Sequence, residues 1–265
     1  MLSRHALVLA SLVLLSACAR SPAGKPAHTV RVGATAVPHA EILEVVRPIL
    51  AQQGVKLEVK VFNDYVQPNE QLLQGQLDAN YFETKPFLDQ FNAARGAHLT
   101  PVVGVHIEPM GAYSRRYHAT SALPDGAQVV IPNEASNEGR ALLLLQQAGL
   151  IRLKDPQNPL ATLNDIAANP KKLQIRELEG ASLPRVLDQV DLAVINTNYA
   201  LDAHLDPRRD ALVLESSSSP YVNYLVTRPD DAQDPDVKAL AAALTGPQVK
   251  AFIRDHYKGA VLPAF

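Results

Sequence analysis

Segments with the two-residue repeat of a strand alternate with segments of helical repeat along almost the whole chain. This alternation constrains the fold more than any other feature. Residues 55–62 place valine or leucine at every second position with lysine and glutamate between them, which is typical of a strand with one solvated face. Residues 38–53 carry apolar side chains at helical spacing instead. The alternation predicts an α/β fold with mostly parallel sheets.

The remaining elements follow from the same patterns. Further strands are expected at residues 30–34, 128–132, 173–178, 191–195, 212–214 and 221–227, and further helices at 86–95, 237–244 and 247–257. A helix is also expected from a cap at Ser136 or Asn137 to Gly149. Pro48 should kink the helix at 38–53, and Thr162 with Asp165 resembles a capping box.

The single cysteine, Cys18, ends a segment with the layout of a secretory signal peptide. An arginine precedes an apolar run at residues 6–15, and Leu-Ser-Ala-Cys18 then has the pattern of a bacterial lipobox. In that pattern residues 1–17 are removed and Cys18 carries the lipid, with residues 19–28 as a tether. An ordinary signal peptide with an incidental cysteine is the alternative. Because the apolar run is shorter than the ~20 residues that span a bilayer, we expect a soluble protein held to a membrane by lipid.

Composition and motifs exclude several classes of function. Lys and Arg number 25 against 27 Asp and Glu, and the basic residues are scattered, so nucleic acid is not expected as a partner. The sequence contains no G-x-S-x-G, P-loop, G-x-G-x-x-G or H-E-x-x-H signature of an enzyme. His106 and Glu108 lie two residues apart without a third ligand nearby in the sequence. We therefore expect no catalytic residue, metal or cofactor.

Polar and aromatic residues stand where predicted strands end and helices begin, which is where open α/β sheets bind ligands. Arg140 lies one turn into a predicted helix, so it and the free N–H groups of that helix could hold a carboxylate. Asn196 and Asn223 stand beside apolar strands. Each has a plainer alternative: a surface arginine, a turn residue and a hydrogen-bonded strand side chain.

Three rings, Tyr65, Tyr81 and Phe82, lie near strand–helix junctions in a chain with 5% aromatic residues and no tryptophan. For any one ring alone, core packing is the alternative. Together with the polar residues they predict a site for a small zwitterion with an apolar tail. Arginine and the helix start would take its carboxylate, amide oxygens its ammonium, and the rings its tail.

The same segments resemble the MetQ/NlpA family, the lipid-anchored substrate-binding proteins of methionine ABC importers. The resemblance covers about residues 30–262 and is carried by Val32-Gly-Ala-Thr35, Pro38-His-Ala-Glu-Ile-Leu43, Phe62-Asn-Asp-Tyr-Val-Gln-Pro-Asn69, Asp78-Ala-Asn-Tyr-Phe82, Lys85-Pro-Phe-Leu-Asp89, Asn137-Glu-Gly-Arg140, Ala193-Val-Ile-Asn196 and Ser219-Pro-Tyr-Val-Asn223. It implies two α/β lobes, a periplasmic-binding-protein-like fold, with a ligand cleft between them. The first lobe would comprise residues 28–107 and 223–265, and the second residues 108–222.

The resemblance also assigns roles to residues. The family's ring residues match Tyr65, Tyr81 and Phe82, and its polar ligand-binding residues match Asn137, Arg140, Asn196 and Asn223. Thr84 departs from the family pattern, because a histidine is expected at its position.

The implied function is a non-enzymatic lipoprotein that binds L-methionine, with D-methionine as a further candidate, and delivers it to an ABC permease and its ATPase. A methionine-containing dipeptide is an alternative ligand, and an extracytoplasmic enzyme or a structural lipoprotein that reuses the fold is an alternative class. We expect the protein in the cell envelope, facing the periplasm or exterior. Whether the anchoring membrane is the inner or the outer one stays open.

Overall fold

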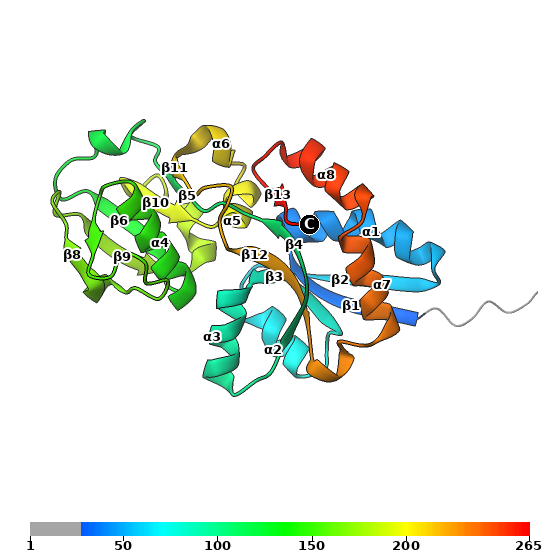
Figure 1. The fold of residues 1–265 in the computed structure, drawn as a ribbon. Coiled ribbons are helices and arrows are strands. Elements are labelled where there is room, and N and C mark those ends of the chain that lie inside the picture. The colour runs from blue at the N-terminus through cyan, green and yellow to red at the C-terminus, as the bar shows by residue number, and fades with distance from the viewer. Residues whose placement is uncertain (1–27) are drawn as a thin grey trace, which may run out of the picture.

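The computed structural model describes residues 28–265, so the predictions for the leader, Cys18 and most of the tether lie outside it. The described chain forms two α/β lobes, each built on its own sheet (Figure 1). No helix among these residues has the length and apolar character needed to cross a bilayer.

The first lobe contains a six-stranded sheet in the order β13–β4–β12–β3–β1–β2. Its strands are β1 (His28–Thr35), β2 (Val55–Phe62), β3 (Ala79–Thr84), β4 (Thr100–Ile107), β12 (Val222–Thr227) and β13 (Leu262–Pro263). Its helices are η1 (Ala36–Ala40), α1 (Glu41–Gln52), α2 (Gln67–Leu73), α3 (Lys85–Arg95), η5 (Pro229–Asp231), α7 (Pro235–Leu244) and α8 (Pro247–Tyr257). One apolar core joins α1, α7 and α8 to the sheet, and a second core lies under α2 and α3 (Figure 1).

The second lobe contains a five-stranded sheet in the order β11–β5–β10–β6–β9 and a two-stranded sheet of β7 and β8. Its strands are β5 (Gly111–Tyr113), β6 (Gln128–Pro132), β7 (Arg152–Leu153), β8 (Ile166–Ala168), β9 (Gln174–Leu178), β10 (Leu192–Ile195) and β11 (Ala211–Leu214). Its helices are η2 (Thr120–Ala122), α4 (Ala135–Gln147), η3 (Leu163–Asp165), η4 (Gly180–Val186), α5 (Thr197–Asp202) and α6 (Pro207–Asp210). A third apolar core lies between α4 and the sheet.

The prediction of mostly parallel sheets is wrong. β1 pairs in parallel with β2 and β3, and β6 with β9 and β10. However, β12 is antiparallel to both β3 and β4, and β5 is antiparallel to both β10 and β11. The chain leaves the first lobe after β4 and returns to it at β12 (Figure 1). Strand β5 therefore enters the second sheet from the first lobe, and β12 enters the first sheet from the second lobe.

The predicted strands and helices are confirmed, with local corrections. The N-cap of α4 is Glu134, and Ser136 and Asn137 lie in the first turn instead. α1 runs as one helix through Pro48, and the departure from helical geometry lies earlier, at Val37. The capping box at Thr162 is confirmed, on a short 3-10 helix. Strand β4 was not predicted, because residues 100–107 show no regular alternation of polar and apolar side chains.

Candidate ligand-binding site

A cavity between the lobes gathers most of the predicted site residues. It holds about 370 Å³ of space unoccupied by protein atoms, part of it open to solvent. Its lining comprises His39, Tyr65, Phe82, Glu83, Thr84, Phe87, Glu108, Asn137, Arg140, Asn196, Thr197, Asn198 and Asn223. Of the eight predicted ligand contacts, only Tyr81 is missing from this list.

One wall of the cavity is aromatic. The ring of Tyr65 lies 5.9 Å from that of Phe82 and 5.7 Å from that of Phe87, measured between centroids. The Tyr65 hydroxyl donates a hydrogen bond of 2.6 Å to Asn198 Oδ1 in the second lobe. Tyr199 lies outside the cavity lining and packs behind this wall, with its ring 4.9 Å from that of Tyr65. These contacts form an apolar core that spans both lobes, and its rings suit an apolar or thioether group.

Tyr81 lies elsewhere than the sequence predicted. Its side chain is fully buried in the core of the first lobe, and its hydroxyl bonds to His106 Nδ1. Successive residues of a strand point to opposite faces, so Tyr81 and Phe82 do not share one face. The sheet register also skips Phe82 at this point, because Tyr81 pairs with Leu225 and Glu83 with Tyr224. Phe82 is therefore the one of these two rings that reaches the cavity.

Arg140 lies in the cavity wall, but its bidentate face is already occupied. Nε and Nη2 donate to the two carboxylate oxygens of Glu215 at 2.7 and 2.6 Å, and Nη2 also donates to the backbone oxygen of Glu108. The guanidinium lies 4.2 Å from the ring centre of Tyr221. Within residues 28–265, Nη1 makes no hydrogen bond, so it is the nitrogen left for a ligand carboxylate. The sequence suggested that Arg140 would make a bidentate contact with the ligand carboxylate. In the structure the bidentate contact is made with Glu215 instead.

The helix start at α4 also differs from the expectation of free N–H groups. The Ser136 N–H donates to Gln90 Oε1 at 2.8 Å, and those of Asn137 and Glu138 donate to the backbone oxygen of Glu134. The first turn is thus largely satisfied by protein. Gln90 belongs to α3 in the first lobe, so this contact instead joins the lobes.

The three predicted amides meet at the cavity from three elements. Asn196 Nδ2 donates to Asn137 Oδ1 at 3.2 Å, and Asn196 Oδ1 is a buried acceptor with no partner among the described residues. Asn223 lies between Thr84 and His106 in the sheet, and its Oδ1 lies 3.1 Å from His39 Nε2. Asn196 therefore offers an oxygen for a ligand donor, whereas the oxygen of Asn223 is in use.

Glu83 and Thr84 form the end of the wall beside the rings. Thr84 is half-buried and begins α3 without capping it through its side chain. Glu83 is buried and accepts a hydrogen bond of 2.9 Å from Asn69 Nδ2, while its Oε1 has no partner within the described part of the chain. Burial raises the pKa of Glu83 to about 8. Its side chain is thus mostly neutral at pH 7, and a buried charge is avoided at this end.

Sequence reasoning missed six lining residues: His39, Glu83, Phe87, Glu108, Thr197 and Asn198. Their proximity to the predicted residues is a signal that could have found five of them. Glu83 and Phe87 flank Thr84, and Thr197 and Asn198 follow Asn196. His39 lies inside a family-matching segment. Glu108 gives no such signal, because its partner His39 is distant in the sequence.

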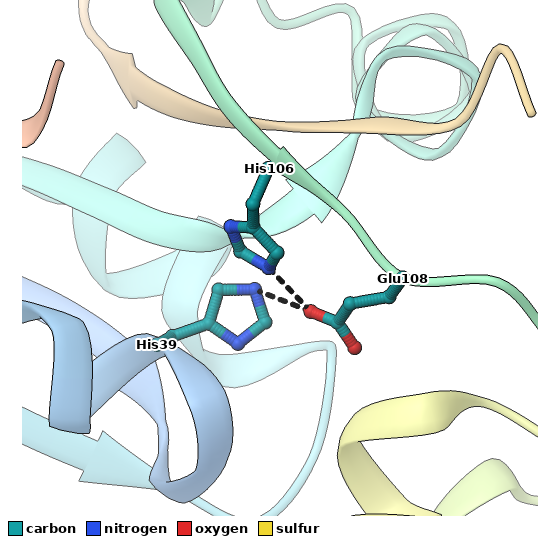
Figure 2. A group of neighbouring side chains, drawn as sticks. All are labelled: His39, His106 and Glu108. Carbon is teal, nitrogen blue, oxygen red and sulfur yellow. Dashed lines mark hydrogen bonds and ion pairs between the residues drawn. The ribbon is translucent and has the colours of Figure 1, made fainter. Parts of the chain in front are cut away.

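His39, His106 and Glu108 are the residues of the described chain best suited to a metal, with ligand atoms within 4.8 Å of one another (Figure 2). Glu108 Oε1 lies 2.7 Å from His106 Nε2 and 3.2 Å from His39 Nε2. Two ligands of a tetrahedral ion at 2.0–2.1 Å would be roughly 3.3 Å apart. The closer pair is at hydrogen-bond distance, so the arrangement observed is a hydrogen-bonded group.

Two α/β lobes, joined by crossing strands and enclosing a cavity with aromatic and polar walls, define a substrate-binding protein of the periplasmic type. The chain belongs to the NlpA lipoprotein family, which matches residues 30–265. It is 42% identical over 228 residues to the D-methionine-binding lipoprotein MetQ of Escherichia coli, covering 85% of this chain and 84% of that protein.

Two solved structures share the fold across nearly their whole length. A nutrient-binding protein from Burkholderia cenocepacia bound to methionine is 46% identical, with a TM-score of 0.86, and the match covers 89% of this chain and all of that one. A periplasmic substrate-binding protein of an ABC transporter from Coxiella burnetii is 43% identical, with a TM-score of 0.85 and the same coverage. The expected family and two-lobed fold are confirmed.

Proposed function

We propose that this protein is the substrate-binding subunit of an ABC importer and that it binds methionine in the cavity between its lobes. The observation that carries the proposal is the division of the cavity wall. One part of the wall consists of aromatic rings from the first lobe. The other part consists of the Arg140 cation, the Glu108 carboxylate and asparagine amides, which lie at the junction of the lobes and on the second lobe. A zwitterion with an apolar tail is complementary to such a wall. The methionine-bound relative from Burkholderia cenocepacia supports the choice of methionine.

In this proposal the thioether lies against Tyr65, Phe82 and Phe87, where sulfur–aromatic contacts contribute ~0.3–1.5 kcal/mol each. The ligand carboxylate approaches Nη1 of Arg140, whose charge Glu215 shares. Asn196 Oδ1 accepts a hydrogen bond from the ligand, which supplies the partner that this buried oxygen lacks within the described chain.

We further propose that the lobes comprise residues 28–107 with 223–265, and 108–222. The strands of the six-stranded sheet and those of the five-stranded sheet fall on the two sides of these boundaries, except for Val222 at the start of β12. Two crossings at these points would serve as the hinge for closure around a ligand.

We also propose that a lipid on Cys18 anchors the protein to a membrane of the cell envelope, where it faces the periplasm or the exterior. Its partners would be an ABC permease and its ATPase. The relative from Escherichia coli is named a lipoprotein and that from Coxiella burnetii an ABC transporter component. Mass spectrometry of the membrane-extracted protein should find a lipid-modified Cys18 at the new N-terminus. A Cys18→Ala variant should stay unlipidated and retain its ligand affinity.

A ligand panel read by thermal unfolding and calorimetry tests the binding proposal. L-Methionine, D-methionine, norleucine, a methionine dipeptide and an unrelated amino acid such as aspartate form the panel. At a thousand-fold excess over its dissociation constant a ligand adds ~4 kcal/mol to stability, which raises the melting temperature by several degrees. Methionine is expected to bind and aspartate is not. A protein that responds only to the dipeptide would reassign the ligand, and one that responds to none would contradict the proposal.

A further inference from the structure

The hydrogen-bonded group of His39, His106 and Glu108 lies where the chain leaves the first lobe. His39 belongs to η1 and His106 to β4, and Glu108 follows β4 directly. All three side chains are at least nine-tenths buried. Figure 2 shows both imidazoles converging on one carboxylate oxygen, Oε1, while the second oxygen points away from them.

The hydrogen bond at its outer nitrogen, Nδ1, fixes which nitrogen of His106 carries the proton. His39 Nδ1 lies 2.7 Å from Thr35 Oγ1, and His106 Nδ1 is bonded to the Tyr81 hydroxyl. Burial raises the pKa of Tyr81 well above its ordinary value, so this hydroxyl keeps its proton and donates it to Nδ1. The imidazole proton then resides on Nε2, which donates to Glu108. Burial also lowers the pKa of His39 to about 4 and of His106 to about 3, so both rings are neutral at pH 7.

The neutral imidazole of His106 orients the Glu108 carboxylate without neutralising its charge, and His39 Nε2 lies between Glu108 Oε1 at 3.2 Å and Asn223 Oδ1 at 3.1 Å. Burial raises the pKa of Glu108, and the charge of Arg140 and a hydrogen bond from the backbone N–H of Asn198 offset only part of that effect. The nearest permanent cation, Arg140, is paired with Glu215. No side chain of residues 28–265 donates a hydrogen bond to Oε2, and Glu108 lines the cavity. A carboxylate held in this way lacks a cation, and the cavity is where one can reach it.

We propose that Glu108 is the counter-ion for the ammonium group of the ligand and that His39, His106 and Tyr81 are positioning residues that aim it. This inference rests on the proposed function and narrows the ligand class to compounds with a free primary ammonium. Deaminated and N-acylated analogues leave the buried charge unpaired and are rejected. In a peptide, only the N-terminal residue meets the requirement.

Calorimetry with two ligands tests this role. L-Methionine is compared with 4-(methylthio)butanoic acid, its deaminated analogue, which keeps the carboxylate and the tail. The protein is expected to prefer methionine by at least ~30-fold, the effect of losing one partner of a buried charge pair. In Glu108→Gln this preference should collapse, with weaker methionine binding and unchanged or tighter binding of the analogue.

Two further variants separate positioning from general damage. Tyr81→Phe removes only the hydroxyl that orients His106, outside the cavity, and should reduce the preference for methionine severalfold while leaving the analogue unaffected. Glu138→Gln changes a buried glutamate on α4 that lies outside the cavity lining, and should leave the preference unchanged.

The outcomes distinguish this inference from the proposed function. Failure of methionine to bind the unaltered protein overturns the proposed function. Methionine binding with the same preference in Glu108→Gln, or binding that requires added Zn²⁺, overturns the role of Glu108 alone. If Glu108→Gln does not fold, an unchanged preference in Tyr81→Phe overturns the positioning by His106.

Discussion

Arg140 is the residue whose surroundings differ most from what its sequence position suggests. Its guanidinium and the Glu215 carboxylate form a buried bidentate pair, with side-chain exposures of 4% and 11%. Removing one partner of such a pair leaves an unpaired buried charge, which costs roughly 3–5 kcal/mol. Arg140→Ala is therefore expected to lower both the free energy of unfolding and the affinity for methionine.

Urea unfolding and calorimetry of the unaltered protein and two variants separate the two effects of Arg140. The double variant Arg140→Ala with Glu215→Ala should regain much of the stability, because no charge is left alone, but should not regain the affinity. A single Arg140→Ala variant as stable as the unaltered protein would contradict the importance of this pair.

Glu83 gives the protein a distinctive dependence of stability on pH. Its pKa rises from about 4.5 in the unfolded chain to about 8 in the folded one, so the folded state binds an extra proton between these values. Stability from this group is complete below pH 4.5 and is lost as the pH rises through about 8. Glu83→Gln, which cannot ionise, should be the more stable protein at pH 9 by up to ~5 kcal/mol and similar to the original at pH 5.

Comparing the stability of the two proteins at each pH separates the effect of Glu83 from that of His39 and His106. The lowered pKa values of these histidines change the stability with pH in the opposite direction. Those imidazoles weaken the folded state as the pH falls below about 6.5 in both proteins. Chemical unfolding from pH 5 to 9 measures the difference. Parallel curves for the two proteins would show that Glu83 is ionised in the folded state at neutral pH.

Thr84 lines the cavity beside the rings where a histidine is expected in the family. A smaller side chain leaves room for a longer or more polar tail, so we predict that D-methionine or a methionine dipeptide competes measurably with L-methionine. Thr84→His should narrow the range of ligands that bind. A methylene group in a pocket contributes only ~1–3 kcal/mol to the binding free energy, so a larger side chain at this position can cancel that contribution for a longer tail. Identical ligand rankings by calorimetry for both proteins would exclude Thr84 as a determinant of selectivity.

At the scale of elements, α4 owes its position to a glycine. A Cβ at Gly139 would lie 2.2 Å from the backbone oxygen of Pro159, which no side-chain rotation can relieve. Alanine would gain about 1 kcal/mol of helix propensity, but overpacking costs ~1–3 kcal/mol and must displace either the helix or the loop. Gly139→Ala should thus lower the free energy of unfolding, and it should weaken methionine binding because Arg140 follows it directly.

The control for Gly139→Ala is Gln147→Ala, at an exposed position near the end of the same helix. This change should alter the stability by less than about 0.5 kcal/mol. Unfolding curves and calorimetry are compared for both variants. An unchanged or raised stability in Gly139→Ala would mean that the loop at Pro159 yields at no cost.

For the whole molecule, direct contacts between the lobes set how readily the cavity closes. Tyr65 donates to Asn198 across the cavity, and Tyr199 donates to the backbone oxygen of Asn63 at 3.4 Å. Tyr65→Phe keeps the ring but removes the first bond, worth ~0.5–1.5 kcal/mol net. The closed form loses that stabilisation, so methionine should bind roughly two- to tenfold more weakly.

Small-angle scattering completes this prediction. The ligand-free Tyr65→Phe protein should have a larger radius of gyration than the original, and saturating methionine should bring the two together. A change in affinity without a change in the ligand-free radius would assign the effect of Tyr65 to ligand contact rather than to closure.

The sequence by itself determined the local elements and most of the cavity lining. Period-two and helical spacing depend on neighbours along the chain, so strands such as β2 and β6 and helices such as α3 and α8 follow from their own residues. The family segments then located Tyr65, Phe82, Asn137 and Asn223, since each lies at the end or start of such an element.

Only the tertiary structure decided which side chains meet. Pairing of β3 with β12 turned Phe82 toward the cavity and Tyr81 into the core. Glu215 reached Arg140 across 75 residues of sequence. His39 and His106 came together on Glu108 because β1, which precedes η1, and β4 end at the same edge of the first sheet, although the two histidines are 67 positions apart in the chain. Periodicity reports the surroundings of one element, whereas charge pairing and ligand contacts arise between elements that long-range sheet pairing places together.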